Sequence, residues 1–287
     1  MLRAAQSAPI LLRDVGGRVA AFLREQFNSN GGARRRSAES DLYYTVFALE
    51  GLAALGHTPP VDATLSYLRS FDAGADLDLV HRACLARCWA SMPAGTLDAD
   101  TARRILVYIE AYRSDDGGYG ALPGSDYGTV YNCFLCLGAY QDLGGELPNP
   151  EGLVRCLDGL RTDDGAYANE HSLRLGTTPS TAAAAIVLPA LGRPVPPTVG
   201  DWLLSRCRDH GGFLATPDAP IPDLLSTATA LHALTALDVS VAGIKEACLD
   251  YIDSLWTGRA FHGHWADDVE DCEYTYYALL ALGHLSS

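Results

Sequence analysis

Five acidic residues crowd into a run of seven positions near the C-terminal end of the sequence: Asp267, Asp268, Glu270, Asp271 and Glu273. Carboxyl groups that lie close together raise one another's pKa because like charges disfavour ionisation. A carboxylic acid that keeps its proton near neutral pH can donate that proton to a substrate. The run therefore indicates an acid catalyst, a metal or diphosphate site, or a solvated cap at the start of a helix.

Aromatic residues gather on the apolar segments around this run and in earlier parts of the chain. Ring faces attract cations, so a cavity in which carbocations form needs several of them. Trp265 precedes the acidic run, and Tyr274 and Tyr277 follow its last aspartates. The other predicted substrate contacts are Tyr44, Phe47, Tyr127 and Tyr131. Rings on a doubly buried helix can equally belong to the core, so packing is the alternative for each of them.

The elements that must position these residues follow from an internal repeat. A glycine turn, a short polar gap and an alanine- and leucine-rich segment recur along the whole chain. The repeats are centred on six glycines: Gly32, Gly74, Gly118, Gly165, Gly212 and Gly263. Repeats of this kind bury their apolar faces on their neighbours. We therefore expect residues 1–287 to form a single domain.

Each repeat contains two segments with helical spacing. The segment before the glycine turn is amphipathic, as in ADTARRILVYIEAYR, whereas the segment after it is apolar nearly all round, as in YYALLALG. An amphipathic helix belongs at the surface and an apolar one in the interior. Candidate N-caps of the inner helices are Ser40, Ser125, Asp223 and Asp271. The pattern predicts an all-α fold, an (α/α)6 toroid of two concentric layers around a central cavity.

The turns GGYG and GGF, followed by a short gap, an aspartate and a T-x-x-x-L-type helix, resemble the prenyltransferase/squalene-cyclase repeat. This repeat is shared by protein prenyltransferase β subunits and class II terpene cyclases, and the resemblance spans all six units. It implies an α/α toroid and an isoprenoid-handling enzyme with a hydrophobic small-molecule substrate. Members without catalysis share the repeat, so a toroid that only binds a lipid or a protein partner is the alternative from another class.

The resemblance also bears on metal binding. Protein prenyltransferases are similar in holding a catalytic zinc with Asp, Cys and His from the starts of two inner helices. Asp223 matches the aspartate, but Leu225 occupies the cysteine position and Tyr274 the histidine position. Because a catalytic zinc needs about three protein ligands, we expect no zinc and no other resident metal. Mg²⁺ would enter only with a bound diphosphate, and a prenyltransferase-like enzyme without the usual zinc site is a further alternative.

Class II cyclases open one inner helix with the motif D-x-D-D, whose third residue protonates the polyene. The segment Asp268-Val269-Glu270-Asp271 is similar, with glutamate in the third place. The resemblance implies that Glu270 is the catalytic acid and that Asp268 and Asp271 assist it. We therefore predict a class II-like terpene cyclase that starts cyclisation with an acid in an aromatic cavity. In the alternative interpretation, Asp271 only caps its helix and its neighbours face solvent.

The overall charge narrows the choice of partners. The chain carries 21 basic and 35 acidic residues, a net charge of −14. Nucleic acid needs a positive footprint on its partner, which this balance does not provide. No stretch approaches the roughly 18 apolar residues of a transmembrane helix, and no signal sequence is recognised. We expect a cytoplasmic protein without a transmembrane segment, and leave a protein partner or a homodimer open.

Overall fold

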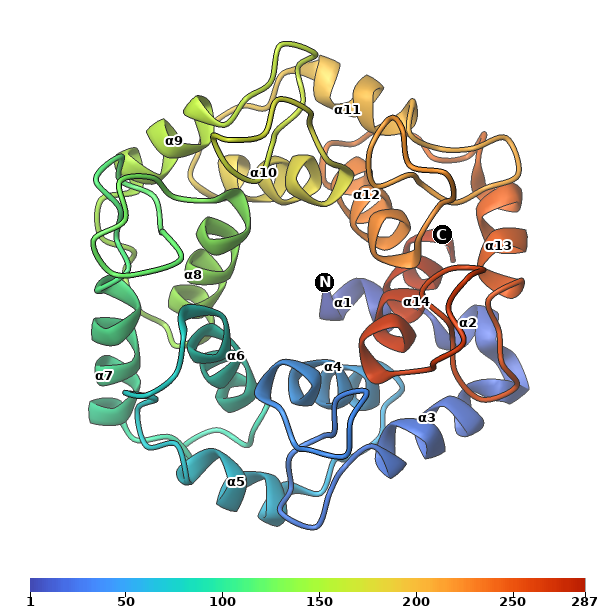
Figure 1. The fold of residues 1–287 in the computed structure, drawn as a ribbon. Helices are drawn as coiled ribbons and strands as arrows, with labels where there is room; N and C mark the ends of the chain where they lie inside the picture. The colour runs from blue at the N-terminus through green and yellow to red at the C-terminus, as the bar shows by residue number, and fades with distance from the viewer. Residues whose placement is uncertain (287) are drawn as a thin grey trace.

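The computed structural model describes residues 1–286, and within them the chain folds into helices and loops without a named strand. Two layers of helices surround a central axis (Figure 1). The inner layer consists of α4 (Leu42–Ala54), α6 (Leu79–Ala90), α8 (Val130–Asp142), α10 (Thr178–Ala190), α12 (Leu224–Ala236) and α14 (Cys272–Leu285). The outer layer consists of α3 (Gly16–Glu25), α5 (Val61–Arg69), α7 (Ala99–Glu110), α9 (Pro150–Gly159), α11 (Pro197–Leu204) and α13 (Lys245–Asp253). The predicted all-α toroid of six helix pairs is confirmed.

The inner helices form a closed ring. Each contacts the next one in the chain, and α14 contacts α4, as Figure 1 shows. The junction of α14 with α4, here called the seam, is held by side chains from the two ends of the chain. Arg36 donates from Nε to Asp271 at 2.8 Å and from Nη2 to Asp267 at 2.6 Å. Both carboxylates are nearly buried, whereas the guanidinium is about one-third exposed. The first and sixth repeats are thereby joined by charge as well as by packing.

Helix caps fix where the inner helices begin. Asp223 and Asp271 accept hydrogen bonds from the backbone N–H groups of Ser226 and Tyr274, as predicted for these two caps. The other two predicted caps are wrong by one residue and by four residues, because Asp41 caps α4 in place of Ser40 and Thr129 caps α8 in place of Ser125. The two serine hydroxyls bond within their own loops instead.

A buried threonine ties each of four glycine turns to the helix that follows it. The hydroxyls of Thr45, Thr181, Thr227 and Thr275 accept hydrogen bonds from backbone N–H groups in the turn regions, those of Ala33, Tyr167, Phe213 and Phe261, at 2.9–3.4 Å. Cys133 occupies the equivalent place in α8 and lies 4.0 Å from Cys156 of α9. The threonines therefore join each turn to the inner helix of its own repeat, and the contact between the two cysteines joins the third repeat to the outer helix of the fourth.

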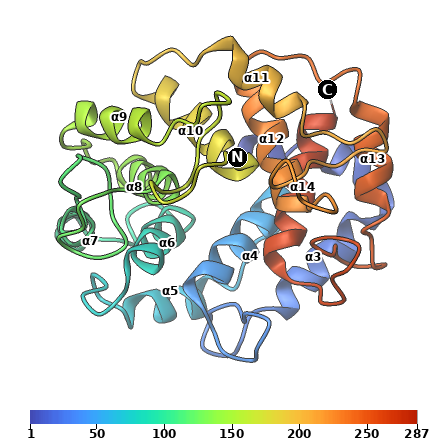
Figure 2. The same cartoon turned by 45° about the horizontal axis from the view of Figure 1, so that its top comes forward.

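An N-terminal segment outside the repeats crosses one end of the ring. It contains α1 (Leu2–Ala5) and α2 (Pro9–Leu12), and α1 packs against α14 and α4 (Figures 1 and 2). The approach is so close that a Cβ added at Gly283 would lie 1.9 Å from the Ala4 carbonyl oxygen. Gly283 lies in the last turn of α14, so α1 covers the end at which the inner helices finish, here called the lower end. The upper end is where they begin.

Candidate functional site

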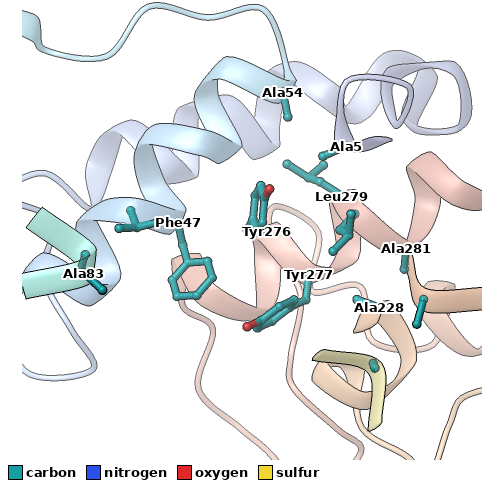
Figure 3. Close-up of a cluster of buried hydrophobic side chains, with 14 of the residues drawn as sticks. Ala5, Phe47, Ala54, Ala83, Ala228, Tyr276, Tyr277, Leu279 and Ala281 are labelled. Carbon is teal, nitrogen blue, oxygen red and sulfur yellow. The ribbon is translucent and has the colours of Figure 1, made fainter. Parts of the chain in front are cut away.

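The inner helices enclose a lumen whose upper part is apolar. This part, the apolar chamber, has a volume of about 320 Å³. It is lined by residues of α4, α8, α10, α12 and α14, among them Tyr43, Tyr131, Phe134, Ala183, Leu225 and Tyr277. Phe47 and Tyr277 lie beside this space with ring centroids 5.4 Å apart, and Figure 3 shows the two rings reaching in from neighbouring helices. The chamber combines aromatic rings on one side with small aliphatic side chains on the other.

Glu273 lies in the first turn of α14, one turn above Tyr277 on the same helix face, beside the chamber lining and not among the residues that line it. The Tyr43 hydroxyl donates a hydrogen bond to Glu273 Oε1 at 2.6 Å. Burial raises the pKa of Glu273 to about 7, and the nearby charge of Asp271 adds to this rise. The Tyr43 hydrogen bond opposes the rise without cancelling it. A pKa in this range lets Glu273 carry a proton near neutral pH.

The phenols around Glu273 stay neutral. Burial raises the pKa of Tyr43, Tyr131 and Tyr277 above the usual range for tyrosine. A neutral phenol can donate a hydrogen bond to a carboxylate, and its ring face attracts a cation. The arrangement can thus deliver a proton into an apolar space and stabilise the positive charge that results.

The three carboxyl groups predicted as catalytic occupy different surroundings. Glu270 accepts hydrogen bonds from the Thr257 hydroxyl at 2.7 Å and from Arg259 Nε at 2.6 Å. It lines a surface groove beside Arg259, and it is not among the described residues that line the lumen. Asp268 is exposed to solvent. Asp271 is buried beneath Arg36 as the cap of α14, two residues before Glu273 in the sequence.

The predicted aromatic contacts divide into two groups. Phe47, Tyr131 and Tyr277 line the lumen. Four others do not line it: Tyr44, Tyr127, Trp265 and Tyr274. Tyr44 lies near the Arg36–Asp271 pair, and the ring of Tyr274 lies under the Arg36 guanidinium. Tyr127 packs on His171 and Trp265 on His210, in loops outside the ring of inner helices.

Two lumen residues, Tyr43 and Phe134, were recognisable as aromatic in the sequence but were not among the predicted contacts. Glu273 belonged to the acidic run, but no separate role was predicted for it. Its spacing of four residues from Tyr277 is the signal that places both on one helix face. The partner of Glu273 was not predictable, because Tyr43 lies at the other end of the chain.

The lower part of the lumen is polar. This polar chamber has a volume of about 570 Å³ and lies between the lower ends of α4, α6, α8, α10 and α12 and the N-terminal segment. Glu50 and Arg87 form a two-point ion pair there, with Nη2 3.0 Å from Oε2. Asp142 faces the same space, and burial raises its pKa. The rest of the polar chamber's lining includes a histidine and several other hydrogen-bonding side chains.

A histidine pair closes one side of the polar chamber. His232 Nδ1 lies 3.0 Å from His284 Nε2. Burial lowers the pKa of His232 to about 3 and that of His284 to about 4. Both imidazoles are therefore neutral at physiological pH, and His232 borders the apolar chamber as well as the polar one. The two chambers share further lining residues, including Phe134 and Ile186, and form one continuous lumen.

The residues at the three positions that correspond to zinc ligands in protein prenyltransferases have other roles in this structure. Asp223 caps α12 through Ser226, Leu225 lines the apolar chamber, and Tyr274 packs beneath Arg36. Within residues 1–286, no three His, Cys, Asp or Glu side chains are grouped closely enough to hold a metal ion. No helix in the described part of the chain is long and apolar enough to cross a membrane.

Comparisons with known proteins agree with this architecture. The family model of the prenyltransferase alpha-alpha toroid domain matches residues 17–84, 83–193 and 183–286. The structure is similar to the type II terpene cyclase MstE from Scytonema, solved as a variant with its substrate geranylgeranyl dihydroxybenzoate. That similarity has a TM-score of 0.62 at 15% identity, over 100% of this chain and 98% of the cyclase. The apo form of the same enzyme has a TM-score of 0.62 at 14% identity, with the same coverage.

A second kind of enzyme is also similar. Candida albicans protein geranylgeranyltransferase-I, solved with GGPP, has a TM-score of 0.54 at 13% identity, over 97% of this chain and 80% of that one. A search of curated proteins finds no match to the sequence. The structural similarities at these identities establish the fold, and the family model covers nearly the whole sequence. The chain belongs to the prenyltransferase alpha-alpha toroid domain family.

Proposed function

We propose that this protein is a class II-like terpene cyclase in which Glu273 donates the proton that starts cyclisation. The observation that carries the proposal is a single one: a half-buried carboxyl group with a pKa of about 7, hydrogen-bonded to Tyr43, whose ring lines the aromatic chamber. The similar type II terpene cyclase, whose solved complex holds a geranylgeranyl substrate, supports it as well. The proposal places the acid at Glu273, three residues after the position that the D-x-D-D resemblance implies.

The geometry suggests how the proton moves. Glu273 Oε1 accepts the Tyr43 hydrogen bond, which leaves Oε2 to carry the proton toward the chamber. When the terminal double bond of a polyprenyl chain lies against Oε2, the O–H bond breaks and a C–H bond forms, leaving a carboxylate and a tertiary carbocation. The Tyr43 hydroxyl stabilises the new carboxylate, because hydrogen bonds to charged acceptors are stronger than those to neutral ones.

The carbocation then reacts within the chamber. The electron pair of the next double bond forms a C–C bond to the cationic carbon and moves the charge one unit along the chain. The rings of Tyr131, Phe134 and Tyr277 face this path and stabilise the charge. Loss of a proton to water ends the sequence, so the overall reaction is an isomerisation.

Substitution of the two competing acids tests the proposal. Glu273→Gln keeps the shape and the Tyr43 hydrogen bond but cannot release a proton. Turnover of a polyprenyl substrate, measured as cyclic product by gas chromatography, should fall about 10²–10⁴-fold. Glu270→Gln removes the acid that the sequence motif implies and should leave turnover within about twofold. Asp126→Asn, at an exposed loop position of the third repeat, is the control.

Each outcome has a distinct meaning. Loss of turnover in Glu273→Gln alone supports the proposal. Loss in Glu270→Gln alone would return the acid to the position implied by the motif and refute the role of Glu273. Equal activity in all three variants would favour the non-catalytic alternative, in which the lumen only binds its ligand.

A further inference from the structure

Two pairs of cysteines lie at joints between neighbouring repeats. The sulfurs of Cys133 and Cys156 are 4.0 Å apart, and the same distance separates the sulfurs of Cys207 and Cys248. Cys207 belongs to the segment that joins α11 to α12 in the fifth repeat, and Cys248 belongs to α13, the outer helix of the sixth. A disulfide bond is about 2.05 Å long, so the sulfurs of each pair must approach by about 2 Å to form one.

A close backbone contact brings Cys207 and Cys248 together. Gly211 of the same segment packs directly on α13: a Cβ added there would lie 1.9 Å from the Ala247 carbonyl oxygen and 2.8 Å from the Cys248 backbone nitrogen. Gly211 also has a φ of +83°, in the left-handed region that favours glycine. No side chain separates the turn from the helix at this point, so the fold itself holds the two thiols side by side.

The two pairs differ in their access to solvent. Cys133 and Cys156 are both buried, whereas Cys207 is partly exposed beside the buried Cys248. All eight cysteines lie in the described part of the chain, and the seven others are buried. Thiol–disulfide exchange requires the attacking sulfur to reach its reagent. Access therefore favours Cys207 over every other cysteine as the first to react.

We propose that Cys207 and Cys248 form a redox-sensitive clamp, which closes by exchange with a small-molecule disulfide such as glutathione disulfide. The closed clamp ties the segment before α12 to α13 and so fixes the joint between the fifth and sixth repeats. The inner helices of these repeats supply Leu225 and Tyr277 to the apolar chamber. The clamp therefore limits the motion of one wall of the lumen, and it does not depend on the proposed cyclisation.

The hydrogen bond between the two sulfurs assists the exchange. It raises the pKa of Cys207 and lowers that of Cys248, so Cys248 is the sulfur that ionises first. As Cys207 attacks one sulfur of glutathione disulfide, its proton passes to the Cys248 thiolate and one glutathione thiolate leaves. That glutathione takes the proton, and the Cys248 thiolate attacks the Cys207 sulfur and displaces the second glutathione. The protein loses two electrons, and glutathione disulfide is reduced to two glutathione molecules.

Incubation of the reduced protein with glutathione disulfide, followed by peptide mass spectrometry, tests the clamp. The peptides of Cys207 and Cys248 should be joined by a disulfide, while those of Cys133 and Cys156 keep free thiols. Cys248→Ser lacks the second thiol, so Cys207 should instead retain a bound glutathione. Cys156→Ser, which removes one partner of the sealed pair, is the matched control and should leave the bond between Cys207 and Cys248 unchanged.

The closed clamp should also change the stability of the folded protein. It links positions that are 41 residues apart, and closing a loop of this size predicts a Tm about 5–10 °C higher in the oxidised protein than in the reduced one. Dithiothreitol should reverse the rise, and Cys207→Ala should abolish it. Hydrogen exchange of the backbone amides of residues 208–223 should slow on oxidation, because the clamp restrains this segment.

Free thiols at both positions after the incubation would overturn the clamp, as would an oxidised pair with unchanged Tm and unchanged hydrogen exchange. Joining of Cys133 to Cys156 at the same rate would overturn the selection by access. Circular dichroism establishes that each variant is folded, and Cys207→Ala takes the place of Cys248→Ser if the buried serine prevents folding. None of these measurements involves a substrate, so full turnover in Glu273→Gln would refute the cyclisation proposal and leave the clamp standing.

Discussion

Replacing Glu273 by glutamine should make the protein more stable at alkaline pH. The folded-state pKa of Glu273 is about 7, raised from an ordinary value of 4.5 chiefly by burial. A carboxyl group whose pKa rises on folding contributes stability that is full below pH 4.5 and is lost as the pH rises through 7. The pKa difference corresponds to about 3 kcal/mol at pH 8, as an upper value, since one pKa unit equals about 1.4 kcal/mol.

Glutamine keeps the volume and the acceptor for Tyr43 but carries no charge, so it avoids this penalty. We expect the free energy of unfolding of Glu273→Gln to exceed that of the wild type by about 1–3 kcal/mol at pH 8 and by less than about 1 kcal/mol near pH 5. Urea titrations followed by circular dichroism at the two pH values measure the difference. Glu270→Gln is the control: it loses only a partly exposed ion pair with Arg259, worth about 0–1 kcal/mol. Destabilisation of Glu273→Gln by the same amount at both pH values would refute the reasoning.

Three other predictions follow from the same geometry. Turnover should be constant at acid pH and fall as the pH rises through about 7. Tyr43→Phe should shift this fall to higher pH, because the hydrogen bond that it removes favours the carboxylate form of Glu273. A pH–rate profile checks both, and a fall at the same pH in Tyr43→Phe would contradict the role of Tyr43. Arg36→Ala should lower the free energy of unfolding by about 2 kcal/mol, because it leaves two nearly buried carboxylates without their cation; a loss below about 0.5 kcal/mol in urea unfolding would contradict a charged seam. Metal analysis of the purified protein should find far less than one zinc per chain, and a full equivalent that is lost in Asp223→Asn would revive a zinc site.

The fold was predictable because the same pattern of turn and helices recurs in all six repeats. The six glycine turns separate amphipathic from apolar helices, and this difference indicates an outer and an inner helical layer. A closed ring follows because every repeat must bury two faces on its neighbours. The N-terminal segment was not predicted, because it stands outside the repeat and its packing depends on Gly283, nearly the whole chain away.

The site was predictable only in part, because its residues depend on rotation about a helix and on contacts between distant segments. The acidic run correctly marked the start of α14, but five adjacent carboxyl groups point in different directions. Glu270 meets Arg259 at the surface, whereas Glu273 turns toward Tyr43 at the lumen. Among the aromatic residues, Trp265 and Tyr127 sit in loops before their helices, so proximity in sequence did not bring them into the cavity.

Turnover in D₂O tests the central claim most directly. If Glu273 delivers a solvent-derived proton to the terminal double bond, the cyclic product formed from geranylgeraniol in D₂O should carry one deuterium, on the methyl group created by protonation. Mass spectrometry and NMR of the product locate it, and Glu273→Gln should form this product at least about 100-fold more slowly. An unlabelled cyclic product, or a labelled one formed at an undiminished rate by Glu273→Gln, would contradict acid-initiated cyclisation by this residue.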